Sequence, residues 1–105
     1  MNKGRQMGNT SIETTLGAQL QAKNLTLATA ESCTGGLIGQ RITAVSGSSD
    51  YYTGGVIAYS NDVKMALLDV PEAVLVEHGA VSAPVAEAMA EGVRTRLDAD
   101  LALST

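Results

Sequence analysis

The 105-residue sequence has no tryptophan, no phenylalanine and a single cysteine, Cys33. One cysteine excludes an internal disulfide and is typical of a reducing compartment. No apolar run approaches the roughly 20 residues of a membrane-spanning helix, and no signal-peptide pattern opens the chain. Seven basic residues against eleven acidic ones leave no basic field to attract nucleic acid. We therefore expect a cytoplasmic protein that binds neither nucleic acid nor a membrane.

Aliphatic residues and alanine supply most of the apolar content, which is 45% of the chain. This length and content suit one domain with a modest aliphatic core. Residues 1–10 contain two glycines and no apolar periodicity, so we expect a flexible tail there and a domain over residues 11–105.

Helical and strand patterns alternate along the domain. The expected helices lie at residues 12–23, 37–45, 61–68, 72–78 and 83–97, and the expected strands at residues 25–29, 54–59 and 101–105. Three of these helices are preceded by a candidate N-cap, which is Ser11 or Thr10 for the first, Ser60 for the third and Ser82 for the last. Gly54 and Gly55 open the second strand, where a glycine pair indicates a bulge or a close backbone approach. The pattern predicts an α/β domain with helices packed on a sheet.

The most informative stretch is the turn between the first strand and the second helix. A strand that turns sharply into a helix exposes its turn residues at the edge of the sheet. Ser32 lies in this turn and is our candidate nucleophile, although a serine here could equally cap the helix. Cys33 is an alternative nucleophile, but a free cysteine is more often a small buried residue.

The rest of the turn offers binding groups. Thr34 and the N–H groups of Gly35 and Gly36 could hold a phosphate or an oxyanion. Glu31 could pair with a cation or stay solvated. One glycine pair is a weak signal, and the sequence has neither a Walker-type motif nor a cluster with metal-ligand spacing.

A serine nucleophile needs a base. His78, the only histidine, lies at a predicted helix end, where histidine commonly interacts with the terminal carbonyls. Serine–lysine pairs are an alternative, and Lys64 follows the second strand as Ser32 follows the first. The carboxyl ends of such strands converge on one crevice. Tyr59 and Asn61 flank this position and could hold a substrate or relay a proton, whereas the plainer interpretations are a solvated Lys64 and a half-buried Tyr59.

Four linked motifs resemble the C-terminal domain of the CinA competence/damage-inducible family, whose stand-alone form is the bacterial nicotinamide mononucleotide deamidase. They are Ala30-Glu31-Ser32-Cys33-Thr34-Gly35-Gly36, Gly47-Ser48-Ser49, Gly54-Gly55-Val56-Ile57-Ala58-Tyr59-Ser60-Asn61 with Lys64, and His78-Gly79-Ala80-Val81-Ser82. The likeness runs in order from about residue 11 to residue 105.

The resemblance implies a three-layer α/β/α domain with a mixed or mostly parallel sheet. Domains of this family often form homo-oligomers, so the resemblance implies such an assembly here. It implies hydrolysis of nicotinamide mononucleotide to nicotinate mononucleotide and ammonia, a step of pyridine-nucleotide salvage, with no metal or organic cofactor. Ser32 is then the nucleophile, Lys64 its base, and Tyr59 a neighbour of both. Substrate contacts are expected from the rest of the turn and from the second strand's end: Glu31, Cys33, Thr34, Gly35, Gly36 and Asn61.

The resemblance also implies further strands, a glycine-rich loop and a final helix beyond residue 105, which contribute to the substrate pocket. We therefore expect residues 11–105 to be the N-terminal portion of such a domain. A second interpretation follows, in which this portion is a non-catalytic module that binds a nucleotide phosphate or mediates assembly.

Overall fold

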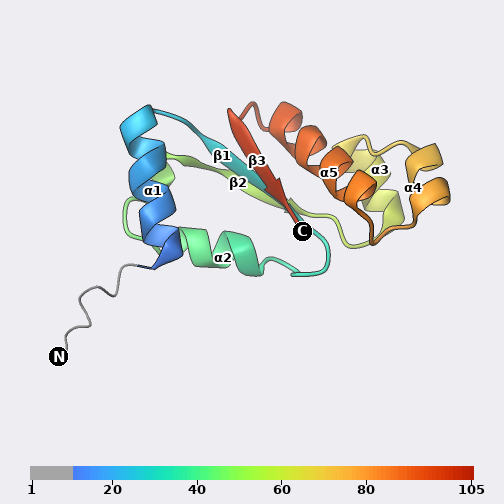
Figure 1. The fold of residues 1–105 in the computed structure, drawn as a ribbon, viewed down its shortest axis with the longest axis horizontal. Helices are drawn as coiled ribbons and strands as arrows, with labels where there is room; N and C mark the ends of the chain where they lie inside the picture. The colour runs from blue at the N-terminus through green and yellow to red at the C-terminus, as the bar shows by residue number, and fades with distance from the viewer. Residues whose placement is uncertain (1–10) are drawn as a thin grey trace.

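The computed structural model describes residues 11–105 (Figure 1), and the tail expected at residues 1–10 lies outside that range. Its elements are α1 (Ile12–Lys23), β1 (Leu27–Glu31), α2 (Leu37–Thr43), the short 3-10 helix η2 (Ser48–Asp50), β2 (Tyr52–Ile57), α3 (Asn61–Leu68), α4 (Glu72–His78), α5 (Ala83–Arg96) and β3 (Leu101–Ser104).

The three strands form one parallel sheet in the order β2-β1-β3. The central strand β1 pairs with both neighbours, so that Ala30 lies opposite Val56 on one side and Ser104 on the other. Every residue of β1 is buried, as expected for a parallel strand covered on both faces. The predicted α/β class is confirmed.

Helices cover both faces of the sheet. On one face, Ala28 and Ala30 belong to a cluster with residues of α3, α4 and α5. Its almost completely buried members, each at most 2% exposed, include Leu68, Val85, Met89 and Val93. On the other face, Leu27 packs with residues of α1, α2 and the segment before β2: Leu20, Ile42 and Tyr51. The expected three-layer arrangement is therefore present (Figure 1).

Two predicted strands were misplaced by two residues each. β1 begins at Leu27 rather than residue 25, because the Leu25 N–H closes α1 on Leu20 and Thr26 is tied to Asp100. β2 begins at Tyr52 rather than residue 54, because Tyr52 pairs with Leu27 and a bulge follows between Leu27 and Ala28. Tyr59 therefore lies beyond the end of β2.

The predicted helix starts are confirmed. The Ser11, Ser60 and Ser82 hydroxyls accept hydrogen bonds from main-chain N–H groups three residues ahead. The second helix ends at Thr43, two residues earlier than predicted, and the last helix and strand end one residue earlier. The Ser60 cap fixes the start of α3, the helix that carries Lys64.

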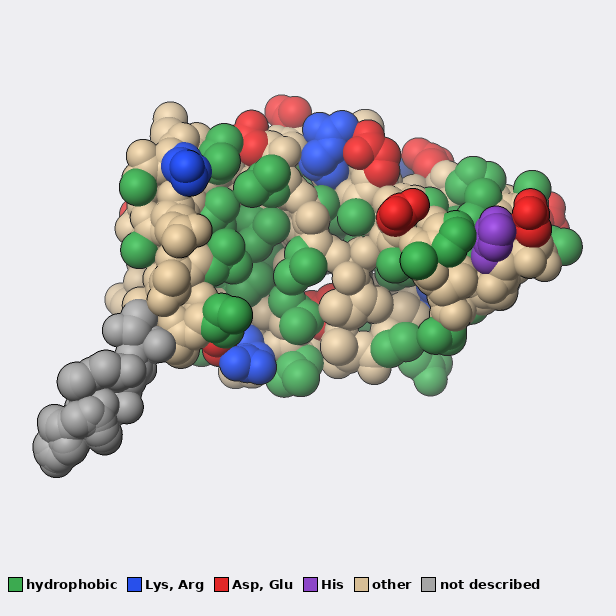
Figure 2. All heavy atoms as spheres, viewed as in Figure 1, with side chains coloured by type: hydrophobic (Ala, Val, Ile, Leu, Met, Phe, Trp, Pro, Cys, Tyr) green, Lys and Arg blue, Asp and Glu red, His purple; other side chains and the backbone are tan. Residues whose placement is uncertain are grey.

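Hydrophobic side chains remain exposed between α1 and β3, where Figure 2 shows a group of them on the visible face. Leu101 and Leu103 of β3 are 44% and 43% exposed, and Ile12 of α1 is 77% exposed. The layer formed by α1 and α2 thus covers its face of the sheet only in part.

Among residues 11–105, none of the helices has the length and apolarity to traverse a lipid bilayer.

Candidate active site

Ser32 and Lys64 are in direct contact. Ser32 follows the last residue of β1, and Lys64 lies on α3. The Lys64 Nζ donates a hydrogen bond to the Ser32 Oγ at 3.0 Å and another to the main-chain carbonyl of Tyr59 at 2.9 Å. Two strand-to-helix crossings therefore bring a hydroxyl and an amine to one point, as the topological argument predicted.

The Lys64 side chain is buried without a counter-charge. The residue is 1% exposed, and within residues 11–105 no carboxylate oxygen lies within 4.0 Å of its Nζ. A charged ammonium is costly to bury without a paired anion. The interpretation of Lys64 as an ordinary solvated lysine is therefore wrong.

Both neighbours of β1 hold the backbone at Ser32. The Ser32 N–H donates to the Thr105 carbonyl at 2.8 Å, on the β3 side. The Ala58 N–H donates to the Glu31 carbonyl at 2.8 Å, on the β2 side. Ser32 thus leaves the sheet from a strand end that is fixed on both edges.

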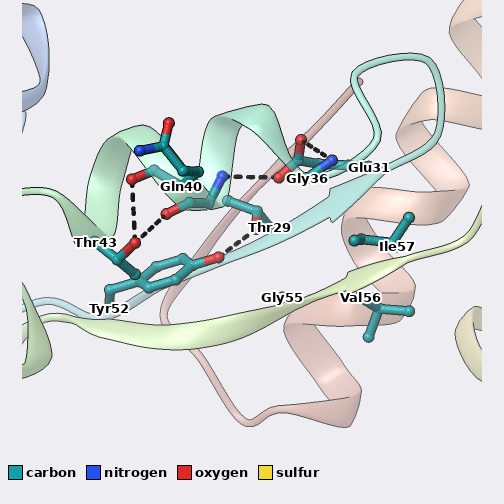
Figure 3. Close-up of a pocket in the computed structure, with 10 residues that line it drawn as sticks. Thr29, Glu31, Gly36, Gln40, Thr43, Tyr52, Gly55, Val56 and Ile57 are labelled. Atoms are coloured by element: carbon teal, nitrogen blue, oxygen red, sulfur yellow. Dashed lines mark hydrogen bonds between the residues drawn. The ribbon is translucent and has the colours of Figure 1, made fainter.

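The Glu31 carboxylate is turned back into the turn and is 3% exposed (Figure 3). Its Oε1 accepts hydrogen bonds from the Thr34 hydroxyl at 2.7 Å, the Gly36 N–H at 3.0 Å and the Ile38 N–H at 2.9 Å. Its Oε2 accepts one from the Gly39 N–H at 2.8 Å. Burial acts to raise the pKa of Glu31, but these four hydrogen bonds together hold it below the ordinary value.

The N–H groups expected to bind an anion are therefore partly engaged. The Gly36 N–H is bonded to Glu31, and the Gly35 N–H donates to the Ser32 carbonyl at 3.2 Å. By contrast, the N–H groups of Cys33 and Thr34 have no hydrogen-bond acceptor among residues 11–105. The unpaired N–H donors of the turn are therefore those of the two residues directly after Ser32. At Gly36, the Glu31 carboxylate already occupies the place that a bound anion would take.

Ser32 and Cys33 open onto a cavity of about 300 Å³. Thr105 lies on one side, and the opposite wall comes from the segment that leads into α5 and from α5 itself: Ala80, Val81, Ser82, Ala83, Ala86 and Met89. The sequence analysis assigned no site function to the motif His78–Ser82. Its presence among the four linked motifs was the one signal that it could belong to the site. None of the side chains that line it is acidic or basic.

The remaining candidates take different positions. Tyr59 accepts a hydrogen bond from Lys64 through its main-chain carbonyl, and the residue is 77% exposed, so it is not half-buried in a strand. Asn61 is exposed as the first residue of α3. His78 ends α4 with its Nε2 3.7 Å from the Glu77 carboxylate, and it does not line the Ser32 cavity. Within the described range, no three His, Cys, Asp or Glu side chains are grouped as metal ligands.

A second cavity of about 230 Å³ lies between α2 and β2, behind Glu31 (Figure 3). Thr29 and Tyr52 share a hydrogen bond between their hydroxyls at 2.6 Å on its wall. A Cβ on Gly55 would lie 2.3 Å from the Thr29 Oγ1, so the glycine permits the close approach that the sequence predicted. This cavity contains neither Ser32 nor Lys64, so it is separate from the candidate site.

Comparison with known proteins gives a consistent result. The family model described as the CinA C-terminal domain matches residues 9–105. A CinA-like protein of Salinibacter ruber is 55% identical over 98 residues, which are 93% of this chain and 24% of that protein. The chain thus spans about a quarter of the length of the curated relatives that it matches.

Solved structures extend the likeness to the fold. A competence-damaged protein (CinA) superfamily protein from Escherichia coli superimposes with a TM-score of 0.86 at 36% identity, over 90% of this chain and 57% of that one. The competence/damage inducible protein CihA from Agrobacterium tumefaciens gives a TM-score of 0.85 at 37% identity, over 88% and 56%.

Proposed function

This chain belongs to the CinA C-terminal domain family, and from that premise we propose that it is an amidohydrolase acting on nicotinamide mononucleotide. The products are nicotinate mononucleotide and ammonia, a step of pyridine-nucleotide salvage. The observation that carries the proposal is the 3.0 Å contact between the Ser32 Oγ and the Nζ of the buried Lys64. A hydroxyl paired with a buried amine is the arrangement that activates a serine without histidine.

In the first half of the reaction, the Ser32 Oγ attacks the carboxamide carbon as its proton passes to the neutral amine of Lys64. A C–O bond forms, and the carbonyl oxygen becomes an oxyanion. The tetrahedral intermediate then collapses, the C–N bond breaks, and Lys64 returns the proton to the departing ammonia. For this step the direction of the 3.0 Å hydrogen bond reverses: the neutral amine turns its lone pair to the Ser32 hydroxyl, and one of its N–H groups still donates to the Tyr59 carbonyl.

In the second half, a water molecule attacks the ester carbon of the acyl-enzyme. Lys64 takes the water proton, the bond between the Ser32 Oγ and the acyl carbon breaks, and the proton returns to Ser32. The nicotinate product leaves with the water oxygen in its carboxyl group. One lysine therefore serves as base and then as acid in each half of the cycle.

The oxyanion needs donors beside the nucleophile. We assign this role to the N–H groups of Cys33 and Thr34, because they are unpaired within the described residues whereas those of Gly35 and Gly36 are engaged. The uncharged cavity beside Ser32 suits the carboxamide-bearing end of the substrate. Tyr59 supports Lys64 through its carbonyl, and Asn61 contributes a substrate contact from the start of α3.

The test is ammonia release from nicotinamide mononucleotide by the wild-type chain and by Ser32→Ala. Wild-type turnover with a loss of at least about 10³-fold in the variant is the expected result. Undiminished turnover in Ser32→Ala would remove the proposal. Calorimetric binding of the nucleotide without any turnover would instead favour the non-catalytic module.

Three further expectations remain predictions with this function. They are a homo-oligomeric assembly, a cytoplasmic location, and substrate contacts from a further part of the domain. The chain covers 57% of the E. coli structure that it matches, so the activity of the whole domain is itself part of the proposal.

A further inference from the structure

We propose that Glu31 is a positioning residue for Ser32: its carboxylate gathers the turn from Thr34 to Gly39 and so leaves the Cys33 and Thr34 N–H groups directed to the oxyanion. Glu31 touches neither substrate nor the reacting atoms in this assignment. The inference rests on the proposed Ser32 chemistry and adds to it the residue that shapes the site.

The contacts of Glu31 reach from Thr34 in the turn to Gly39 in the first turn of α2. Four donors at 2.7–3.0 Å reach its two oxygens, one from a hydroxyl and three from main-chain N–H groups. The N-cap of α2 is Gly36, which has no side chain to satisfy the start of the helix. The side chain at the end of β1 therefore does what an N-cap residue would do for α2.

The position of Glu31 in the chain links these contacts to Ser32. Glu31 directly precedes Ser32, and its own carbonyl is held by the Ala58 N–H at 2.8 Å. The hydroxyl of Thr34 also hydrogen-bonds with the hydroxyl of Thr105. The main-chain carbonyl of Thr105 in turn accepts a hydrogen bond from the Ser32 N–H. The Glu31 carboxylate is therefore linked through the Thr34 hydroxyl to Thr105, the residue that holds the Ser32 N–H.

Loss of this carboxylate would leave four part-buried donors without partners. An N–H group that is shielded from water and unpaired is unfavourable, so the turn would rearrange to find new acceptors. Main-chain carbonyls around Ser32 are the nearest alternative acceptors. If the turn rearranges to bond to them, the Cys33 and Thr34 N–H groups move away from the position where they would stabilise the oxyanion. The expected consequence is a slower chemical step with little change in substrate binding.

Glutamine is a sharp probe of this role because it keeps the size of the side chain. Its amide has one acceptor oxygen, and its NH2 group would meet either the single Gly39 donor or the three donors at Oε1. A matched control is Glu13→Gln. Glu13 lies on α1, and its carboxylate accepts a hydrogen bond at 2.8 Å from the Nε of Arg41 on α2. It makes no hydrogen bond to the turn.

The experiment compares wild type, Glu31→Gln, Glu31→Ala and Glu13→Gln in the full chain at a temperature where circular dichroism shows each to be folded. We expect kcat for nicotinamide mononucleotide to fall about 100-fold in Glu31→Gln with KM within about threefold, and both constants to stay within about threefold in Glu13→Gln. In Glu31→Ala, sodium acetate should restore part of kcat, and sodium chloride at equal ionic strength should not. A folded Glu31→Gln with wild-type kcat overturns the inference.

A second readout separates this inference from the proposed substrate. Diisopropyl fluorophosphate reacts with an activated serine: the Ser32 Oγ forms a bond to phosphorus, the P–F bond breaks, fluoride leaves, and the hydroxyl proton passes to Lys64. Labelling of wild type at least tenfold faster than of folded Glu31→Gln supports the role of Glu31 even if the nucleotide is not the substrate. Equal labelling rates overturn it. An unlabelled wild type overturns the nucleophile itself and with it both proposals.

If Glu31→Gln does not fold, Thr34→Val provides the same test, because it removes one of the four donors and keeps the shape of the side chain. A fall in kcat and in labelling rate that Thr34→Ser restores supports the inference. Wild-type rates in Thr34→Val overturn it.

Discussion

The Nζ of Lys64 lies 3.0 Å from the Oγ of Ser32, although the two residues are 32 positions apart in the chain. Each residue follows its own strand, and the strands β1 and β2 are parallel neighbours in the sheet. The contact therefore results from the parallel pairing of the strands, whose carboxyl ends meet at one edge.

Replacement of Lys64 by methionine should separate activity from stability. Methionine fills a similar volume without an amine, so we expect ammonia release to fall at least about 10³-fold. The free energy of unfolding should stay within about 1 kcal/mol of wild type or rise, because a buried amine without a counter-charge is removed. Urea unfolding and the ammonia assay measure the two quantities. Activity above a tenth of wild type would contradict Lys64 as the base.

The stability contributed by Glu31 should depend on pH. The pKa of its carboxyl is lower in the folded protein than its ordinary value of 4.5. The charged form is therefore favoured by folding, so this contribution is fully present above about pH 4.5 and is lost as the pH falls through the lower, folded-state pKa. Urea unfolding of wild type and Glu31→Gln should differ most at neutral pH and converge in acid. A difference that stays constant from pH 7 to pH 3 would refute the assignment.

Tyr51 carries a buried hydroxyl without a hydrogen-bond partner in the described part of the chain. The residue is 3% exposed and belongs to the smaller apolar cluster. Tyr51→Phe removes the unsatisfied group and keeps the ring, so we expect the free energy of unfolding to rise by about 1 kcal/mol. Chemical denaturation measures it, and Tyr59→Phe, with an exposed ring, is the control. A loss of stability in Tyr51→Phe would indicate that the hydroxyl has a partner.

Gly92 allows α5 to lie directly against α3. A Cβ at this position would lie 1.9 Å from the main-chain carbonyl oxygen of Leu68. In an exposed helix Gly→Ala stabilises by about 1 kcal/mol. Here we expect a loss of about 2 kcal/mol, because the added methyl group overpacks a tight site. Activity should fall too, because α3 carries Lys64. Thermal unfolding and the ammonia assay test this, with Glu91→Ala on the same helix as control, and unchanged stability would exclude the clash.

Local patterns predicted the elements well. The serine caps at Ser11, Ser60 and Ser82 act within one helical turn, so the sequence contains their physical cause. Strand limits were less predictable, because pairing partners set them. Leu25 and Thr26 have strand propensity, yet α1 and Asp100 take up their hydrogen-bonding groups.

The candidate site was predicted only in part. The proximity of Ser32 and Lys64 was predicted because each follows the carboxyl end of a strand, whereas the surroundings of both side chains were not predicted. Glu31 was placed in the exposed turn but ends a buried strand and bonds to the turn itself. Tyr59 was placed at a strand end but contributes a carbonyl. The cavity wall from the segment before α5 joins residues about 50 positions from Ser32, a separation that no local pattern records.

The order of the elements, their caps and the positions of a serine and a lysine after two strands follow from the amino-acid sequence alone, since short-range hydrogen bonding and apolar spacing determine them. The burial of Lys64, the inward turn of Glu31 and the choice of which N–H groups stay unpaired depend on the folded chain. They are decided by which distant groups compete for each donor and acceptor once the sheet and its two helical layers have formed.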